Sequence, residues 1–435
     1  MNYSYLSDSP DLLSVLREFG SVSVPDCEVT ETVSGILEDI RLRGDAALLE
    51  KTLLYDGASL AADEIAVNPA ELTDAQSKLS ESERSAIQEA ITNVELFHNK
   101  SMPEDWSTLN EHGAEVGERH YPIDRVGIYV PGGNVPLVST VIMTVTLAKV
   151  AKVPEIAVVT PPDSNGKVSF QILAALEMLG VSEVYRVGGA QAIASLAFGT
   201  ETINAVDKIY GPGNAYVNEA KRQSFGTVGI DLLPGPSEVM VIADSTANPA
   251  YVAAALLAQA EHGSGKEKIY FLFTDEALFS QVAIEIDLQV KTLSHRQSIL
   301  RVLENGFRSI YLPNLPRLAE VASFIAPEHL ELQVSEENLT LLTEKITTAG
   351  AFLMGHETAT SLGDFAAGPS HVLPTGRSSR FSSGLKLNDF MRRTSFIKYD
   401  ENSARKAQQV IAEFAKMEKL DAHGRSLSMR IEEKG

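Results

Sequence analysis

The sequence of 435 residues contains a single cysteine, Cys27, and this scarcity excludes two classes of structure. One cysteine cannot form an intramolecular disulfide framework, and it cannot supply the thiolates of a structural zinc cluster. Cys27 lies beside acidic residues in "VSVPDCEVTETV", away from every motif considered below. A catalytic thiol is therefore not expected, and the composition favours a cytoplasmic protein.

Long apolar runs and an excess of basic residues are also missing. No stretch of about 18 apolar residues occurs, so no membrane-spanning helix is predicted. The N-terminus lacks the basic segment followed by a long apolar one that is typical of a signal peptide. The formal net charge of −21 argues against a nucleic-acid partner and against anionic membranes, because both bind basic surfaces. We interpret this acidity as a contribution to solubility.

From residue 125 onward the sequence alternates short β-rich runs with apolar segments of helical length. The β-rich runs include "RVGIYV", "EIAVVT", "EVYRVGG", "EVMVIAD" and "KIYFLFT". Strands that alternate with helices predict an α/β fold with mostly parallel sheets covered by helices. Residues 1–25 are expected to form an arm with one short helix, and residues 381–435 a long amphipathic helix followed by a tail.

The stretch "LLAQAEHGSG" ends an alanine-rich helix with Gln259 and His262. Residues three apart are neighbours on a helix surface, and Gly263 is a plausible stop signal. Two polar groups on one side of the last turn can form half of a metal site. They can also be two solvated side chains, and residues 259–262 taken alone favour that second interpretation.

Two further stretches carry groups suited to catalysis. "APEHLEL" places Glu328 next to His329, which gives two proton-transfer groups of different ordinary pKa, although such pairs are common on surfaces. "LGDFAAGPSHVLPT" places Asp364 before a loop that contains His371. This aspartate either caps a turn or supplies a hard oxygen ligand to zinc or manganese.

The remaining candidates are weaker when taken singly. "MEKLDAHGRS" contributes Glu418 and His423, but a polar tail frays unless it docks somewhere. The glycine-rich turns "YVPGGN" and "IYGPGN" allow a close backbone approach to a ligand, yet no G-x-G-x-x-G fingerprint follows the first strand.

The joint order of these stretches resembles that of the histidinol dehydrogenase family over nearly the whole chain. The motifs that carry the resemblance are "VGIYVPGGN", "RVGGAQAIASLAFGT", "KIYGPGNAYVNEAKR", "GPSEVMVIAD", "AQAEHG", "APEHLEL", "GDFAAGPSHVLPT" and "MEKLDAH". The resemblance implies a zinc-dependent enzyme of the last steps of histidine biosynthesis. Such an enzyme oxidises L-histidinol through L-histidinal to L-histidine with two NAD.

The resemblance also implies a role for each matching residue. It implies zinc ligands, one ion per subunit, at Gln259, His262, Asp364 and His423. It implies NAD contacts at Tyr129, Gln191 and Asn214, and an acid–base pair at Glu328 and His329. It implies substrate contacts at Ser237, His329, Glu418 and the four zinc ligands.

The architecture implied by the resemblance is two unequal, incomplete Rossmann-like domains in a homodimer. The expected division assigns 1–25 to the arm, 26–125 with 238–380 to a larger domain that carries most of the zinc site, 126–237 to an NAD-binding domain, and 381–435 to a tail exchanged between subunits. Departures from the usual pattern occur at Leu233, at Ser370 and over residues 144–152.

Two alternatives stay open at this point. A paralogue on the same scaffold would oxidise another small alcohol, such as a sulfonated diol, and would be expected to lose the groups that recognise an imidazole-bearing amino alcohol. A non-catalytic binding protein would be free to lose Glu328, His329 or a ligand. All of these residues are present in the chain, which favours histidinol oxidation.

Overall fold

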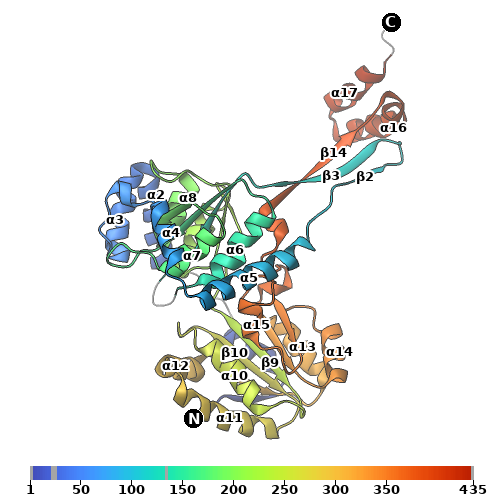
Figure 1. The fold of residues 1–435 in the computed structure, drawn as a ribbon. Coiled ribbons are helices and arrows are strands. Elements are labelled where there is room, and N and C mark those ends of the chain that lie inside the picture. Colours follow the sequence, from blue (N-terminus) through green and yellow to red (C-terminus); the bar gives the residue numbers. More distant parts are fainter. Residues whose placement is uncertain (1–2, 21–26, 133–135, 433–435) are drawn as a thin grey trace.

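The computed structural model describes residues 3–20, 27–132 and 136–432, which form two parallel sheets and an elongated antiparallel arm (Figure 1). Gly133, which the sequence places in a glycine-rich turn, lies outside the described residues. Within the described part of the chain, no helix combines the length and apolar character needed to cross a membrane.

The larger unit is built on a six-stranded sheet with the order β1-β11-β10-β9-β12-β13, and every strand pair in it is parallel. After their first residue, strands β9 and β10 at its centre are continuous apolar runs, because a parallel sheet is covered on both faces. The strands are β1 (Tyr5–Ser7), β9 (Glu238–Ala243), β10 (Lys268–Phe273), β11 (Phe307–Tyr311), β12 (His329–Gln333) and β13 (Ala351–Met354). The helices are α1 (Leu12–Phe19), α10 (Pro249–Ala260), α11 (Ala277–Gln289), η2 (Val290–Thr292), α12 (Arg296–Gly306), α13 (Leu315–Ile325), α14 (Glu336–Lys345) and α15 (Thr360–Phe365).

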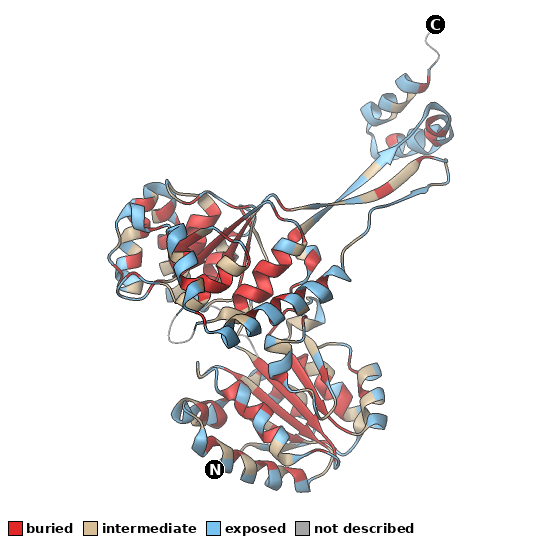
Figure 2. Ribbon diagram, viewed as in Figure 1, coloured by how far each residue is buried: buried red, intermediate tan, exposed pale blue. Residues whose placement is uncertain are grey.

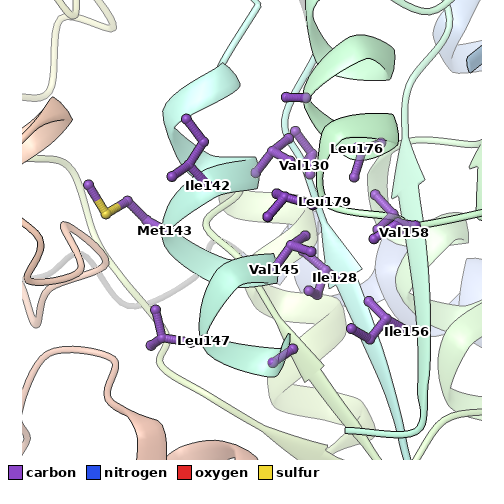
Figure 3. Packing of buried hydrophobic residues seen from close by; sticks show 14 of the residues in the cluster. Ile128, Val130, Ile142, Met143, Val145, Leu147, Ile156, Val158, Leu176 and Leu179 are labelled. Carbon is purple, nitrogen blue, oxygen red and sulfur yellow. The ribbon is translucent and has the colours of Figure 1, made fainter. Parts of the chain in front are cut away.

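The smaller unit is built on a five-stranded parallel sheet with the order β6-β5-β4-β7-β8. Figure 3 shows how helix α6 packs its Ile142 and Val145 on Ile128 and Val158 of this sheet. The strands are β4 (Arg125–Tyr129), β5 (Glu155–Thr160), β6 (Glu183–Arg186), β7 (Lys208–Tyr210) and β8 (Gly229–Ile230). The helices that follow them are α6 (Val138–Val150), α7 (Phe170–Met178), α8 (Gly189–Phe198) and α9 (Ala215–Ser224).

The helices between residues 27 and 99 also cover the five-stranded sheet. Val33 of α2 packs with Val159, and Ile91 of α5 packs with Ile128. This packing differs from the expected division, which grouped 26–125 with 238–380, because the apolar faces of these helices match the smaller sheet. The helices are α2 (Cys27–Arg43), α3 (Asp45–Asp56), η1 (Ala62–Glu64), α4 (Pro69–Ser77) and α5 (Glu81–Asn99).

The arm consists of a three-stranded antiparallel sheet, β14-β3-β2, with two helices at its tip (Figure 1). Its elements are β2 (Trp106–Leu109), β3 (Glu115–Pro122), β14 (Met391–Lys398), α16 (Glu401–Glu418) and α17 (Asp421–Ile431). The expected tail is therefore a second helix rather than a frayed end. The expected boundary at 381 also shifts, because Phe390 in η4 (Leu387–Phe390) stacks on Tyr210 in the core of the smaller unit.

The described arm and its two helices are largely exposed, whereas the two parallel sheets are buried (Figure 2). At the N-terminus, residues 1–25 were expected to form an arm of their own. Within the described part of this segment, β1 instead pairs with β11 of the larger sheet. The α/β fold class with mostly parallel sheets and a C-terminal helical tail is confirmed.

Candidate active site

Helix α10 ends where the sequence predicts, with Gln259 in its last turn and His262 just beyond it. Asn248 caps the start of this helix, and Gly263 after its end has a φ of 68°, which favours glycine. Gln259 is only 4% exposed, and its amide nitrogen has no hydrogen-bond partner in the described part of the chain. His262 is exposed. A buried amide without a partner is unusual and calls for an explanation.

The predicted acid–base pair lies at the amino end of β12, and both residues are buried. His329 Nδ1 lies 3.8 Å from Glu328 Oε2. Glu238, at the amino end of the neighbouring strand β9, holds both residues with its main chain. Its N–H donates to Glu328 Oε2 at 2.7 Å, and its carbonyl oxygen lies 3.3 Å from His329 Nδ1. The pair is therefore fixed by the start of a central strand.

Burial and mutual charge shift the pKa values of these groups. Burial raises the pKa of Glu328 to about 7, against the favourable charge of His329. Burial and the nearby Glu328 carboxylate raise the pKa of Glu238 to about 8. Burial opposes the charged form of His329, yet the carboxylates of Glu328 and Asp364 raise its pKa to about 9. A group whose pKa lies near neutrality, as that of Glu328 does, is suited to general acid–base catalysis.

Asp364 reaches this pair from α15. Its Oδ1 lies 3.3 Å from His329 Nε2, and its main-chain oxygen lies 3.0 Å from His371 Nδ1. Burial would raise the pKa of Asp364, but the imidazoles of His329, His371 and His262 hold it below its ordinary value. Helices α10 and α15 pack on each other. The structure thus places Asp364 against His329 and within electrostatic reach of His262.

This cluster lies at the amino edge of the six-stranded sheet, whereas ligands of parallel sheets are expected at the carboxyl edge. The reason is the direction of the crossover helices. A helix that connects two parallel strands returns from the carboxyl edge to the amino edge, so its C-terminal residues lie at the amino edge. Gln259 and His262 end such a helix, α10.

The predicted cofactor contacts lie at the carboxyl edge of the five-stranded sheet. Tyr129 ends β4, and its hydroxyl accepts a hydrogen bond of 3.3 Å from Gly189 N–H. Gln191 is buried in α8 and donates from Nε2 to Asp56 Oδ2 at 3.2 Å. Burial raises the pKa of Asp56 to about 6. Sequence reasoning missed Asp56, since an aspartate at the end of α3 carries no motif.

Asn214 follows β7, the strand on the other side of β4, so Tyr129 and Asn214 flank the point where the strand order reverses. That point is where open α/β sheets bind their ligands. Asn214 caps α9 by accepting hydrogen bonds from Tyr216 N–H and Val217 N–H. Gly211 approaches Tyr129 so closely that a Cβ atom would lie 2.0 Å from the Tyr129 carbonyl oxygen.

The last three predicted residues divide into two groups. Ser237 lies half-buried, immediately before β9 and next to Glu238. Glu418 and His423 lie instead on the exposed tip of the arm, far from both parallel sheets (Figure 1). They line an apolar groove of about 480 Å³ together with Phe414, Leu420 and Leu427. The structure does not bring His423 to the other three predicted ligands within one chain.

Comparison with known proteins identifies the family. The family model for histidinol dehydrogenase matches residues 22–431. The histidinol dehydrogenase of Rhizobium meliloti is 42% identical over 95% of this chain and 96% of its own, and that of Neisseria meningitidis serogroup B is 42% identical over 98% and 99%. The chain belongs to the histidinol dehydrogenase family. A crystal structure of histidinol dehydrogenase from Elizabethkingia anophelis matches with a TM-score of 0.93 at 36% identity and covers 99% of this chain and 98% of that chain.

Membership in the histidinol dehydrogenase family makes the chain a dehydrogenase. The core donors fit a divalent metal in kind: an amide, an imidazole and a carboxylate provide oxygen and nitrogen without thiolates. Among the described residues, no group of three or more His, Cys, Asp or Glu side chains is close enough to hold a metal.

One departure from the usual histidinol dehydrogenase pattern has a structural explanation. The hydroxyl of buried Ser370 donates to the Met143 carbonyl oxygen at 3.2 Å and accepts from Val372 N–H at 3.3 Å, which ties the His371 loop to α6. Nothing in the structure explains Leu233. Residues 144–152 form the buried second half of α6 and the turn after it.

Proposed function

We propose that this protein oxidises L-histidinol through L-histidinal to L-histidine, with two NAD as hydride acceptors and one zinc ion in each subunit. The observation that supports this proposal most strongly is the convergence of Glu328, His329 and Asp364 at one sheet edge, in a chain of this family. Other family members carry the name of this activity.

Each oxidation removes one hydride and one proton from the substrate. In the first step the alcohol gives its hydride to NAD, and His329 takes the hydroxyl proton. The aldehyde is then hydrated, and Glu328 takes a proton from the attacking water. The hydrate gives a second hydride to a second NAD and becomes the acid. The buried Glu328 carboxylate is suited to the water step, because the pKa of Glu328 lies near neutrality.

Zinc would be held by Gln259, His262 and Asp364 from the core, together with His423. The metal would supply a Lewis acid that holds the substrate by its imidazole and amine. Ser237 and Glu418 would bind the rest of the substrate. For the cofactor we propose contacts with Tyr129, Gln191 and Asn214, which line the strand-order reversal of the smaller sheet.

We further propose a homodimer in which the arm of each chain completes the site of the other. The arm tip exposes large apolar side chains, with Phe414 at 53% and Met417 at 65% exposed, which an isolated chain leaves in water. The groove at the tip holds Glu418 and His423. A second copy that buries this surface would also receive the missing ligand. A cytoplasmic location stays a prediction from the scarcity of cysteine.

The experiment that tests the function is incubation of the purified protein with L-histidinol and NAD, with chromatography for histidine and absorbance for NADH. We expect two NADH for each histidine. A small sulfonated diol serves as the parallel substrate. Oxidation of the diol without turnover of L-histidinol would assign the chain to a paralogous activity, and turnover of neither would favour a binding role.

A further inference from the structure

Strand β12 presents a row of buried polar side chains on one face. His329, Glu331 and Gln333 alternate with Leu330 and Leu332, and successive side chains of a strand point to opposite faces. The two leucines pack in the apolar core on the side of α13 and α14. The three polar residues are at most 7% exposed, so each must find a partner inside the protein.

Each residue of the row contacts the segment that leads into and forms α15. Gln333 Oε1 lies 3.2 Å from His356 Nδ1. Glu331 Oε2 accepts two hydrogen bonds from Thr360, at 3.1 Å from its N–H and 2.9 Å from its hydroxyl. His329 Nε2 lies 3.3 Å from Asp364 Oδ1. The two segments therefore meet in antiparallel order along three successive contacts.

The last two contacts agree in spacing. Two residues of a strand advance about 6.6 Å, and four residues of a helix advance about 6 Å. Thr360 is the first residue of α15 and Asp364 lies one turn later, so fixing Thr360 opposite Glu331 places Asp364 opposite His329.

Glu331 is the middle residue of this row, and both of its carboxylate oxygens accept hydrogen bonds. Its Oε1 accepts a hydrogen bond of 2.8 Å from Gln333 Nε2, while its Oε2 takes both donors of Thr360. It is 1% exposed. A buried carboxylate is costly unless its oxygens are hydrogen-bonded, so losing Glu331 leaves the start of α15 without its anchor.

We propose that Glu331 is a positioning residue that fixes α15 through Thr360 and so holds Asp364 in place, both for His329 and for a divalent metal. The metal part rests on the proposed function, in which Asp364 is a zinc ligand. Groups that hydrogen-bond around a metal site orient its ligands, and their loss weakens metal affinity about 10- to 100-fold.

The first measurement is the zinc affinity of the full-length protein without substrate, by competition with a chromophoric chelator. We expect Glu331→Leu to weaken zinc binding about tenfold or more. Thr360→Val, which removes the hydroxyl but keeps the N–H, should weaken it less. The matched control is Glu219→Gln, which alters a buried carboxylate of the smaller unit that pairs with Arg222. This control should leave zinc affinity unchanged.

A rescue variant separates positioning from general damage. Glu331→Gln alone places an amide donor against the amide donor of Gln333. Combined with Gln333→Glu, the exchange restores one donor and one acceptor between the two positions, and the introduced amide oxygen still accepts from Thr360. We expect the single variant to lose zinc affinity and the double variant to recover most of it.

The second measurement needs no metal. The ring nitrogens of His329, observed by NMR in metal-free protein with ¹⁵N-labelled histidine, report the contact with Asp364. The chemical shifts of these nitrogens should change in Glu331→Leu, return to the wild-type values in the double variant and remain at the wild-type values in Glu219→Gln. Wild-type protein that binds no zinc would refute the metal assignment, and the His329 signals would still test the positioning role. Unchanged His329 signals in a folded Glu331→Leu variant, or unchanged zinc affinity where the wild type binds zinc, would overturn the inference.

Discussion

At the scale of single residues, the site is a set of buried carboxylates whose surroundings set their protonation. Glu238 begins β9 and Glu328 immediately precedes the neighbouring strand β12, and both have raised pKa values because they are buried. Sequence reasoning found Glu328 because the family motif marks it. It missed Glu238, Asp56 and Glu331, because the sequence alone does not show whether an acidic residue in a strand or at a helix end has a buried side chain.

The two members of the acid–base pair should affect different half-reactions. Glu328→Gln should slow oxidation of L-histidinal about a hundred- to ten-thousand-fold and spare the alcohol step, because only the aldehyde step activates water. His329→Asn should impair alcohol oxidation. Stopped-flow measurement with the aldehyde supplied directly separates the steps. Equal loss in both steps from Glu328→Gln would refute the division.

The pH dependence of the aldehyde step should report the raised pKa of Glu328. Because the carboxylate is the active form and its pKa is raised to about 7, the rate should fall as the pH drops through about 7. An ordinary glutamate would lose its charge only near pH 4.3, roughly. The single-turnover rate with the aldehyde, measured between about pH 5 and 9, decides between the two, and a flat profile down to about pH 5 would contradict the assigned base.

At the scale of elements, the apolar strands were predictable and the arm was not. The predicted run "EIAVVT" is a strand over the same residues, and "KIYFLFT" is a strand except for its last residue, since buried parallel strands are continuous apolar runs. β3 and β14 were missed because their exposed faces are polar and charged, and their pairing joins residues far apart in the chain. Long-range pairing of this kind leaves no local pattern.

The turn after β7 gives a prediction at this scale. Gly211 has a φ of 112° and lies against the Tyr129 carbonyl, so Gly211→Ala combines backbone strain with a steric clash. It should lower the free energy of unfolding by about 1–3 kcal/mol from strain alone, and weaken NAD binding as well. Gly226→Ala is the control, because φ there is 102° and nothing lies within 4 Å of the added Cβ. Urea unfolding and NAD titration of both variants should show a larger effect at Gly211.

At the scale of the whole molecule, the core of one chain supplies three of the four proposed ligands and the arm supplies the fourth. A chelator should abolish activity, and zinc or manganese should restore it, because the donor set binds either ion.

The metal content of a ligand variant gives a second test at this scale. His262→Ala should lower the bound metal measured by elemental analysis. Full activity in a preparation shown to be free of metal would exclude a metal requirement.

The central claim, a site shared between two chains, is tested most directly by complementation. His262→Ala damages the core contribution and His423→Ala the arm contribution, so each variant alone should be nearly inactive. When the two are refolded together, about half of the dimers are mixed, and one of the two sites in each mixed dimer receives both intact contributions. The account predicts recovery of about one quarter of wild-type activity if the sites act independently. A mixture that stays inactive although mixed dimers are confirmed would contradict it.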